Sequence, residues 1–395
     1  MTPTTSHPDL NPLKTSQSQS SRQPTIHHAL VPPSDVSELI LTHPADQELQ
    51  HIYNLTHSSW GDALKLPEYL EESTHLANAP LAKNGGLDVW ILTSAESHPN
   101  ERPILSACET FLKRAFVTTS AHNGVNTVEE KIVYGIASVF TNPVYRGNRY
   151  AARMLIKLSD VLKKKEDCVG SMLYSDIGPD YYAKLGWTPT ERNSQVEFHP
   201  KAYDNLPNVE ILTANGLEEL CRLDERMLYT ILEKEKEVKR KMVVVPDLPH
   251  MQWHHAKEGF VCQKLFGKIP ELKGASIGAP GQKVWIIWTH RYYSDPTKLP
   301  NDNTLYILRL ALEDLNSESN GPHLKVLMET AQNEAKAWNL GKVVMWNPKP
   351  EILKLIEKSE VKCKVVEKRG DAIASLKWHE QEKIEWVENE MYAWC

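Results

Sequence analysis

Residues 141–155 combine a turn rich in arginine with the expected start of a helix, and these residue types can hold an anion. The run reads Thr-Asn-Pro-Val-Tyr-Arg-Gly-Asn-Arg-Tyr-Ala-Ala-Arg-Met-Leu. The stretch 131–140 before it, Lys-Ile-Val-Tyr-Gly-Ile-Ala-Ser-Val-Phe, is rich in residues that favour strands. After it, apolar residues recur at helical spacing from Ala151 to Leu162. The predicted order is therefore strand, turn and helix.

The turn has the features of a phosphate site. The first backbone N–H groups of a helix lack intrahelical partners, and the positive end of the helix dipole points the same way. Gly147 lets the backbone approach a ligand closely, and Asn148 tolerates a turn conformation. Three side chains add positive charge here: Arg146, Arg149 and Arg153. The run therefore predicts a pyrophosphate-binding turn; the plainer alternative is an ordinary helix start with basic side chains.

A second motif, Tyr181-Tyr-Ala-Lys-Leu-Gly-Trp187, follows further along the chain. It reads as a short helix closed by Gly186, and Trp187 opens the next strand. The run 169–175, Val-Gly-Ser-Met-Leu-Tyr-Ser, supplies a strand before that helix. Together the two motifs favour an acyl-coenzyme A pocket.

This order of motifs resembles the GNAT superfamily of N-acetyltransferases. The superfamily pattern Arg/Gln-x-x-Gly-x-Gly/Ala falls on 146–151, with Arg149 at the position that usually holds glycine. Either the turn avoids a positive φ at Arg149, or the arginine side chain takes part in phosphate binding. The resemblance implies an α/β fold of the α+β kind with a mixed sheet, and acetyl-CoA as co-substrate. It also implies a set of residues that bind the pantetheine arm and the pyrophosphate: Phe140, Thr141, Arg146, Gly147, Asn148, Arg149, Tyr150 and Ala151.

Acetyl transfer from a thioester to an amine needs a neutral amine, a donor for the oxyanion and a proton for the thiolate. For an amine with an ordinary lysine pKa of about 10.4, deprotonation at pH 7 costs roughly 4–5 kcal/mol, so a nearby base is expected. Glu109, in the middle of a strand, is the candidate base; exposure at a sheet edge or pairing with Lys113 are the structural alternatives. The GNAT resemblance makes Tyr182 the candidate catalytic acid, and a lining role in the pantetheine groove is the alternative.

Composition limits the classes of function. The length of 395 residues predicts two domains, and 41% apolar with 24% charged residues favours a globular protein. No stretch approaches the ~20 apolar residues of a membrane helix, and a net charge of −6 argues against nucleic acid as the main partner. The six cysteines form no CxxC pair and no zinc-ligand spacing. We therefore expect no metal site, no membrane partner and a reducing compartment, by default the cytoplasm.

The chain is expected to divide into three parts. Residues 1–34 hold six serines, five threonines and six prolines, with Asp9 as the only acid, and are predicted to be disordered. Organelle targeting is the alternative for this tail. Residues 35–203 are the expected GNAT-type catalytic domain, and residues 204–395 are a second acetyltransferase-like domain that completes the acceptor pocket.

Several elements are expected before the first motif. The strands are placed at 37–42, 87–93 and 104–112, and a helical pattern ends at Trp60. Residues 118–129 read as a long hairpin loop.

The second half repeats the order strand, helix, strands, helix and strand. Its expected elements lie at 206–213, 217–231, 283–289, 304–310, 323–338 and 342–346. At the place of the phosphate turn stand Glu313 and Asp314, which repel a pyrophosphate. We therefore expect this half to bind no cofactor of its own.

Three features of the second half can contribute to an acceptor pocket. Eight of the eleven tryptophans lie beyond residue 250, either as core or as lining of a cleft between the domains. The segment 249–255, Pro-His-Met-Gln-Trp-His-His, reads as a surface loop in which His255 is a candidate substrate contact. Residues 385–395 are expected to dock as a closing strand, and the terminal carboxylate is an alternative base.

The acceptor is suggested by family likeness alone. The motifs Ala-Cys-Glu-Thr, Tyr-Ser-Asp-Ile-Gly and those above, with a tryptophan-rich second half, resemble the fungal lysine N6-acetyltransferases of lysine catabolism. The resemblance implies free L-lysine as a small-molecule acceptor, giving N6-acetyl-L-lysine and CoA at the start of lysine degradation. Two alternatives stay open: acetylation of a protein, peptide or polyamine amine, and a non-catalytic acyl-CoA-binding module.

Overall fold

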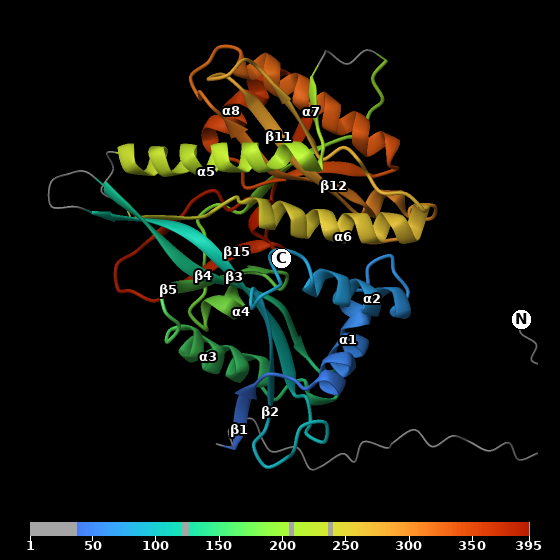
Figure 1. The fold of residues 1–395 in the computed structure, drawn as a ribbon, viewed down its shortest axis with the longest axis vertical. Coiled ribbons are helices and arrows are strands. Elements are labelled where there is room, and N and C mark those ends of the chain that lie inside the picture. Colours follow the sequence, from blue (N-terminus) through green and yellow to red (C-terminus); the bar gives the residue numbers. More distant parts are fainter. Residues whose placement is uncertain (1–37, 121–125, 205–208, 236–239, 395) are drawn as a thin grey trace, which may run out of the picture.

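The computed structural model describes residues 38–120, 126–204, 209–235 and 240–394. The predicted disordered tail, 1–34, lies outside the described residues. Figure 1 shows two sheets placed one above the other along the long axis, with two long helices crossing the middle. The fold is a mixed α/β arrangement, as the sequence predicts.

The first sheet carries the predicted catalytic motifs. Its strands, in spatial order, are β1 (Leu39–Thr42), β2 (Leu87–Ser94), β3 (Ser106–Ser120), β4 (Asn126–Thr141), β5 (Cys168–Ser175), β15 (Ile373–Trp378) and β6 (Thr188–Pro189). The short strand β9 (Lys241–Val244) pairs with β3 and with β16 (Glu385–Trp386). β4 and β5 run parallel, whereas β3 and β4 are antiparallel.

The second sheet repeats this plan. Its spatial order is β14 (Cys363–Glu367), β7 (Ser194–Phe198), β13 (Lys342–Trp346), β12 (Thr304–Leu312), β11 (Val284–Arg291), β10 (Gly274–Ile277) and β8 (Glu210–Leu212). β12 and β13 form its parallel pair. Each sheet therefore has one parallel pair near its centre, and the expected repeat of element order is present.

The helices cover both sheets and the space between them. They are α1 (Asp46–Trp60), α2 (Leu66–Ala77), α3 (Tyr150–Leu162), α4 (Asp180–Ala183), α5 (Leu217–Lys234), α6 (Leu248–Phe266), α7 (Asn320–Ala337) and α8 (Pro350–Ser359). Short 3₁₀ turns lie at η1 (Pro143–Tyr145), η2 (Ala214–Gly216), η3 (Pro300–Asp302) and η4 (Met391–Ala393). α3 and α1 pack on opposite faces of the first sheet, because different alternate residues of β2 and β3 contact each of them. α5 and α6 are the two helices across the middle in Figure 1.

The two sheets exchange strands. β15 comes from the second half of the chain and lies between β5 and β6 in the first sheet. β7 precedes the expected boundary at 203/204 and lies between β13 and β14 in the second sheet. A cut at that boundary therefore separates two strands from their sheets.

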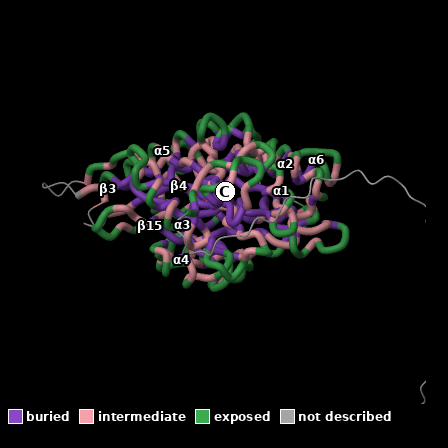
Figure 2. The backbone as a smooth tube through the Cα atoms, turned by 90° about the horizontal axis from the view of Figure 1, so that it is seen from below, coloured by how far each residue is buried: buried purple, intermediate pink, exposed green. Residues whose placement is uncertain are grey.

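The hydrophobic core is also shared between the halves. One cluster of buried side chains includes Val117 and Met172 from the first sheet and Trp285, Leu308 and Trp346 from the second. Viewed along the long axis, buried residues run through the middle of the molecule and exposed ones form its rim (Figure 2). The division of roles between the two halves stays a prediction, but their packing is continuous.

Two expected loops are regular structure instead. β3 and β4 continue beyond the expected ends, since Thr118 pairs with Val128 in their ladder, so the loop predicted at 118–129 was too long; 121–125 lie outside the described residues. The segment 249–255 lies within α6, which Asp247 caps by accepting a hydrogen bond from the His250 N–H at 3.3 Å. Proline at the second position of this helix is a start signal. The loop predicted at 249–255 is therefore wrong.

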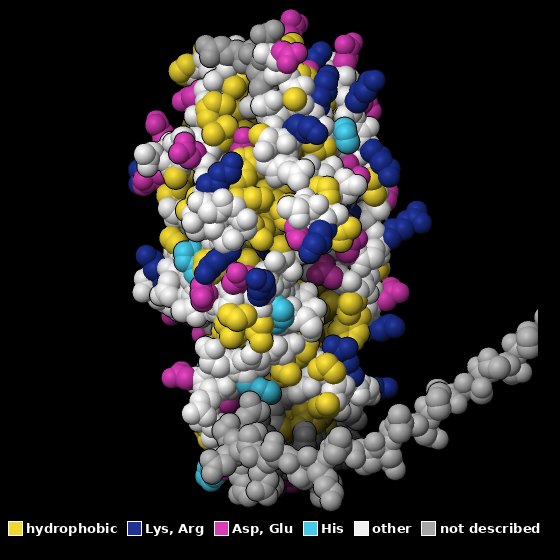
Figure 3. All heavy atoms as spheres, turned by 90° about the vertical axis from the view of Figure 1, so that its right-hand side faces the viewer, with side chains coloured by type: hydrophobic (Ala, Val, Ile, Leu, Met, Phe, Trp, Pro, Cys, Tyr) yellow, Lys and Arg dark blue, Asp and Glu magenta, His cyan; other side chains and the backbone are white. Residues whose placement is uncertain are grey.

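The face built by α1, α2 and α6 carries charges of both signs. Figure 3 shows lysine, arginine, aspartate and glutamate side chains interspersed with apolar groups on this side. In the part of the chain that the structure describes, no helix is both long and apolar enough to cross a membrane.

Candidate active site

β4 and β5 separate toward their carboxyl ends. The two strands pair from Ile132–Cys168 to Gly135–Met172, whereas β5 stays paired with β15 up to Ser175. Among the described strands, residues 136–141 of β4 pair only with β3. Their other edge offers N–H and C=O groups to a ligand, at the carboxyl ends of parallel strands. The predicted pantetheine contacts, Phe140 and Thr141, lie at this edge.

The turn after β4 has the geometry that an anion site needs. Gly147 has φ +86°, and no atom lies within 4 Å of where a Cβ would stand, so the backbone there is open to a ligand. Asn148 stabilises the turn by donating from Nδ2 to the Tyr145 carbonyl at 3.0 Å. α3 begins at Tyr150 with no side-chain cap and no acidic residue in its first turn. The N-terminal backbone amides of α3 therefore face the turn without a competing carboxylate, which fits a pyrophosphate.

The structure decides between the two readings of Arg149. Its φ is +58°, so the turn keeps the left-handed conformation that glycine usually provides. The first alternative, avoidance of a positive φ, is therefore wrong. Arg149 is exposed at this turn with Arg146, whose guanidinium stacks over the Phe140 ring at 5.9 Å and donates from Nε to the Thr141 carbonyl at 3.3 Å. These contacts hold Arg146 between the strand end and the turn.

Glu109 lies opposite a bulge in β4. The register of β3 with β4 shifts between Ala107 and Glu109, and Ser138 at the bulge has φ +52°. The Ser138 hydroxyl donates to Glu109 Oε2 at 2.7 Å. β3 is an interior strand, and no ion pair joins Lys113 to Glu109 among the described residues, so neither structural explanation for this carboxyl holds. Nothing in the sequence marks Ser138, because a positive φ at a serine has no local signal.

The Glu109 carboxyl faces a small cavity on the α1 side of the sheet. The cavity measures about 20 Å³, which is room for one water. Its lining comes from α1, α2, β2, β3 and the bulge, and includes Tyr53, Tyr69 and Ser138. Burial raises the pKa of Glu109, although the Ser138 hydrogen bond and the charge of Lys257 oppose the shift. A carboxyl of this kind is suited to accept a proton near neutral pH.

Tyr182 lies on the opposite face of the sheet. It is buried in the cluster that includes Cys108 of β3 and Leu155 of α3, and its ring meets Tyr181 edge-on at 5.1 Å. Burial, followed by the neighbouring Tyr181, Asp176 and Cys108, raises the pKa of the Tyr182 hydroxyl. The phenol therefore keeps its proton at neutral pH and can donate it. The first sheet therefore lies between Tyr182 and the cavity beside Glu109.

The second half supplies the wall that faces Glu109. One side of α6 carries His250, Trp253, His254 and Lys257 at helical spacing, and Trp253 meets Phe111 of β3 edge-on at 5.7 Å. The helical spacing of these four residues is present in the sequence and indicates that they share one face. The prediction of a loop at 249–255 did not use this spacing.

The wall continues through charged groups and the C-terminal segment. Lys257 donates to both oxygens of Glu72 on α2 at 2.9 Å. Arg291 at the end of β11 pairs with Asp62 at 2.9 Å and stacks on Trp394 at 5.2 Å.

His255 lies on another side of α6. Its Nε2 is 2.9 Å from the Trp288 carbonyl of β11. Burial lowers the pKa of His255 to about 4, so the ring is neutral. The structure does not bring His255 to the Glu109 side, and its substrate role stays a prediction without a supporting contact.

At the corresponding place in the second sheet, the chain's own C-terminal segment lies against β12. β12 and β13 separate after Ile307–Met345. Beyond this point the Leu310 N–H donates to Glu390 Oε2 at 3.2 Å, and the 3₁₀ turn η4 packs against β12. The C-terminal segment, 388–393, thus lies along the edge of β12, which corresponds to the open edge of β4 in the first sheet.

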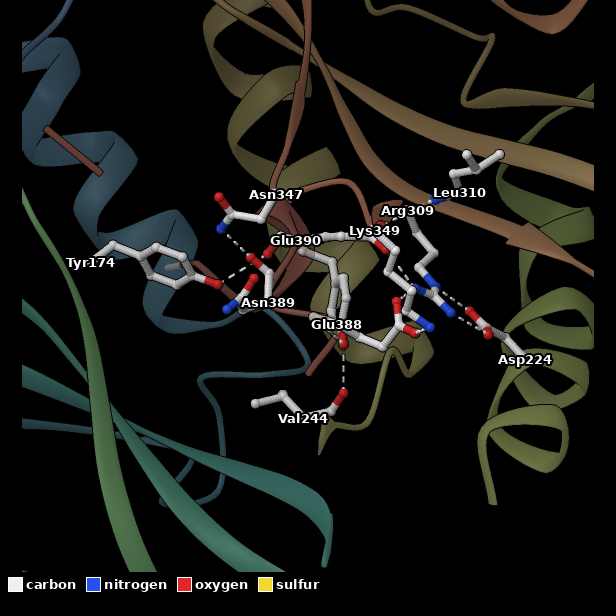
Figure 4. Close-up of polar contacts among 11 residues, drawn as sticks. Tyr174, Asp224, Val244, Arg309, Leu310, Asn347, Lys349, Glu388, Asn389 and Glu390 are labelled. Atoms are coloured by element: carbon white, nitrogen blue, oxygen red, sulfur yellow. Dashed lines mark hydrogen bonds and ion pairs between the residues drawn. The ribbon is translucent and has the colours of Figure 1, made fainter. Parts of the chain in front are cut away.

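Arg309 fixes this C-terminal segment. Its guanidinium is bidentate to Asp224 of α5 at 2.7 and 2.9 Å and contacts Glu388 at 2.8 Å and Glu390 at 2.6 Å, as Figure 4 shows. Burial raises the pKa of Glu390 to about 8. Lys349 and Arg309 overcome the same effect of burial at Glu388 and lower its pKa to about 2. These paired side chains line a cavity of about 90 Å³ between α5, β12 and the C-terminal segment.

Known proteins match this chain in sequence and in structure. The profile of a family described as the LYC1 GNAT-like C-terminal domain matches residues 194–395. The uncharacterized protein YGR111W of Saccharomyces cerevisiae is 23% identical over 91% of this chain and 99% of its own length. The crystal structure of Saccharomyces cerevisiae N-myristoyltransferase with bound myristoyl-CoA superposes with TM-score 0.51 at 10% identity, over 88% of this chain and 81% of that one. A GCN5-related N-acetyltransferase from Kribbella flavida gives TM-score 0.49 at 14% identity, over 86% and 70% of the two chains.

Proposed function

The chain belongs to the LYC1-like family of the GNAT superfamily, whose members are acetyl-CoA-dependent acyltransferases, and on this premise we propose that its acceptor is free L-lysine. The products are N6-acetyl-L-lysine and CoA. This reaction places the protein at the first step of lysine degradation, and we assign it to the cytoplasm.

The observation that carries the proposal is the position of Glu109. Its carboxyl is partly buried, faces a cavity and lies beside the bulge of the strand whose other edge is open. A base at this point stands next to the place where an amine meets a thioester held along β4. The open turn at Gly147 and the arginines beside it support the diphosphate end of the same ligand.

The proposed reaction is a direct transfer. Glu109 takes the proton of the acceptor ammonium, directly or through one water, and the neutral amine attacks the thioester carbonyl. Backbone N–H groups at the bulge stabilise the oxyanion. Tyr182 gives its proton to the departing thiolate, and the raised pKa of the phenol keeps that proton available.

The halves have different proposed roles. Residues 35–203 supply the co-substrate cleft and the catalytic groups. Residues 204–395 carry the Arg309–Glu390 ion pair at the equivalent place, and their proposed role is to supply α6 and the C-terminal segment as the acceptor wall. This assignment is supported by the contact of Trp253 with Phe111.

The test is a comparison of acceptors with acetyl-CoA, read as thiol release. L-lysine, L-ornithine, a polyamine and a histone peptide are offered separately to the full chain. We expect the highest kcat/KM for L-lysine. Release with the peptide and none with lysine would overturn the acceptor, and release with no amine would favour the acyl-CoA-binding module.

A further inference from the structure

Three buried side-chain atoms between the first sheet and α6 make no hydrogen bond with any residue that the structure describes. They are Lys113 Nζ, His250 Nε2 and Trp253 Nε1. Lys113 and His250 are each 1% exposed, and Trp253 is 6% exposed. A buried ammonium without an acceptor loses its hydration and gains nothing in return. Lys113 Nζ and Trp253 Nε1 are donors without an acceptor, and His250 Nε2 is a further nitrogen without a partner. Together they point to a polar ligand that carries negative charge.

The three groups lie on the face of the sheet that carries Glu109. Lys113 and Phe111 follow Glu109 at alternate positions of β3, so their side chains share a face. The Lys113 ammonium is 5.7 Å from the Phe111 ring centroid, and Trp253 meets the same ring edge-on at 5.7 Å. Phe111 therefore contacts both Lys113 and Trp253 on the face of β3 that carries Glu109.

A glycine in β4 sets the direction of the Lys113 side chain. A Cβ at Gly135 would lie 2.5 Å from Lys113 Cε and 3.7 Å from Nζ, so the side chain passes directly over Gly135. Gly135 pairs with Phe111, one step closer to Glu109 than Val133, the partner of Lys113. The ammonium therefore leans along the sheet toward the base.

The resulting separation suits an amino acid with a long side chain. Gly135 and Ala137, the partner of Glu109, are two residues apart in β4, which is about 7 Å along a strand. Six bonds join the side-chain nitrogen of lysine to its carboxylate carbon, and an extended chain of this kind spans about 7 Å. An acceptor whose amine lies at Glu109 can therefore place its carboxylate at Lys113.

We propose that Lys113 Nζ and Trp253 Nε1 form the binding site for the α-carboxylate of the acceptor, and that His250 Nε2 accepts a hydrogen bond from its α-ammonium. The inference rests on the proposed function and names the groups that select an amino acid over a simple amine. His250 Nδ1 is 2.6 Å from Asp247 Oδ1, so Nδ1–H donates to the carboxylate and Nε2 keeps a free lone pair. Burial, followed by the charge of Lys113, lowers the pKa of His250 and keeps the ring neutral.

The test uses cadaverine, 1,5-diaminopentane, which is lysine without its carboxylate. The wild-type chain should prefer L-lysine in kcat/KM. Lys113→Met should lower kcat/KM for lysine by about 10–100-fold and leave that for cadaverine nearly unchanged, because only lysine loses a charged contact. Lys131→Met, on the adjacent β4 and paired with Glu129 at 3.0 Å, is the matched control and should alter neither value.

Two further measurements distinguish a lost contact with lysine from misfolding of the variant. CoA binding by calorimetry reports the integrity of Lys113→Met, and Trp253→Phe removes only the indole donor while keeping a ring against Phe111. Trp253→Phe should lower kcat/KM for lysine alone. Equal losses for both acceptors in a folded Lys113→Met would overturn the inference in favour of a structural partner such as the chain's own terminal carboxylate. Wild-type turnover of neither acceptor would instead refute the proposed function.

Discussion

At the scale of single residues, the surroundings of Glu109 favour a chemical role for its carboxyl over a structural one. A carboxyl inside a sheet is unfavourable unless it is exposed, paired or used. Glu109 lies in an interior strand, and its carboxylate accepts a hydrogen bond from a neutral hydroxyl, that of Ser138. Its raised pKa is the signature of burial that is not compensated by a partner. The residue thus lowers stability at neutral pH while it supports the proposed chemistry.

Glu109→Gln should reduce kcat by about 100-fold or more, because general-base catalysis is lost. It should not reduce stability at pH 8. A raised carboxyl pKa favours the folded state below the unfolded pKa, and this contribution is lost as pH rises through the folded pKa. Pre-steady-state acetyl transfer and thermal unfolding at pH 5 and pH 8 measure the two effects. A wild-type kcat in the variant, or a large decrease of its Tm at pH 8, would contradict the role of Glu109 as a base and indicate a structural role.

Tyr182→Phe should lower kcat and leave the affinity for CoA unchanged, since the ring stays and only the proton donor is removed. Tyr181→Phe is the matched control, because the two rings are in edge-on contact at 5.1 Å and only one is assigned a proton. Single-turnover rates together with CoA titrations give both quantities. If the two variants behave alike, the hydroxyl of Tyr182 has no catalytic part.

At the scale of elements, the strand–turn–helix unit formed by β4, η1 and α3 could be predicted from local sequence. Its order, the short helix at Tyr181 and the position of Glu109 in a strand next to β4 are all present in the structure. Each follows from periodicity, glycine positions and β-branched content within a few residues. The bulge at Ser138 was not predictable, because it depends on how two strands align rather than on either sequence. Helix α6 was missed because Pro249 and the paired histidines also fit a loop.

Arg146→Ala should raise the KM for acetyl-CoA by about 10-fold, which corresponds to ~1.4 kcal/mol, and leave the KM for the amine unchanged. The reason is that contacts with Phe140 and Thr141 hold the Arg146 guanidinium at the turn, where it can pair with the negative charge of a bound diphosphate. Initial-rate kinetics with each substrate varied in turn provide the measurement. Arg222→Ala, an exposed arginine of α5 paired with Glu218, is the control. An unchanged KM for acetyl-CoA in Arg146→Ala would remove the phosphate assignment from this turn.

At the scale of the whole molecule, the two halves share both strands and core. The strand exchange of β7 and β15 and the shared core leave neither half with a complete sheet of its own. Sequence reasoning found the repeat of element order but not this exchange, since the partners of a strand depend on residues far away in the chain. The domain boundary at 203/204 was chosen from local signals, and strand pairing crosses it.

A fragment of residues 38–203 should not fold cooperatively, because it leaves the β5 edge without β15 and exposes core residues that α5 covers. The full chain should unfold in a single transition. Far-UV circular dichroism and tryptophan fluorescence test this together, because eight of the eleven tryptophans lie beyond residue 250 and the second signal mainly follows that half. Coincident curves are expected. Two separate transitions, or a fragment with a sharp melting curve, would contradict the shared core.

The position of β15 has a consequence for biosynthesis. During translation, β1 to β5 leave the ribosome long before residues 373–378 are made, yet β5 needs those residues as its neighbour. The nascent chain must therefore keep a partly open sheet through most of its synthesis, a period when unpaired strands are prone to association with other chains. Completion of the first sheet therefore has to await the synthesis of residues 373–378.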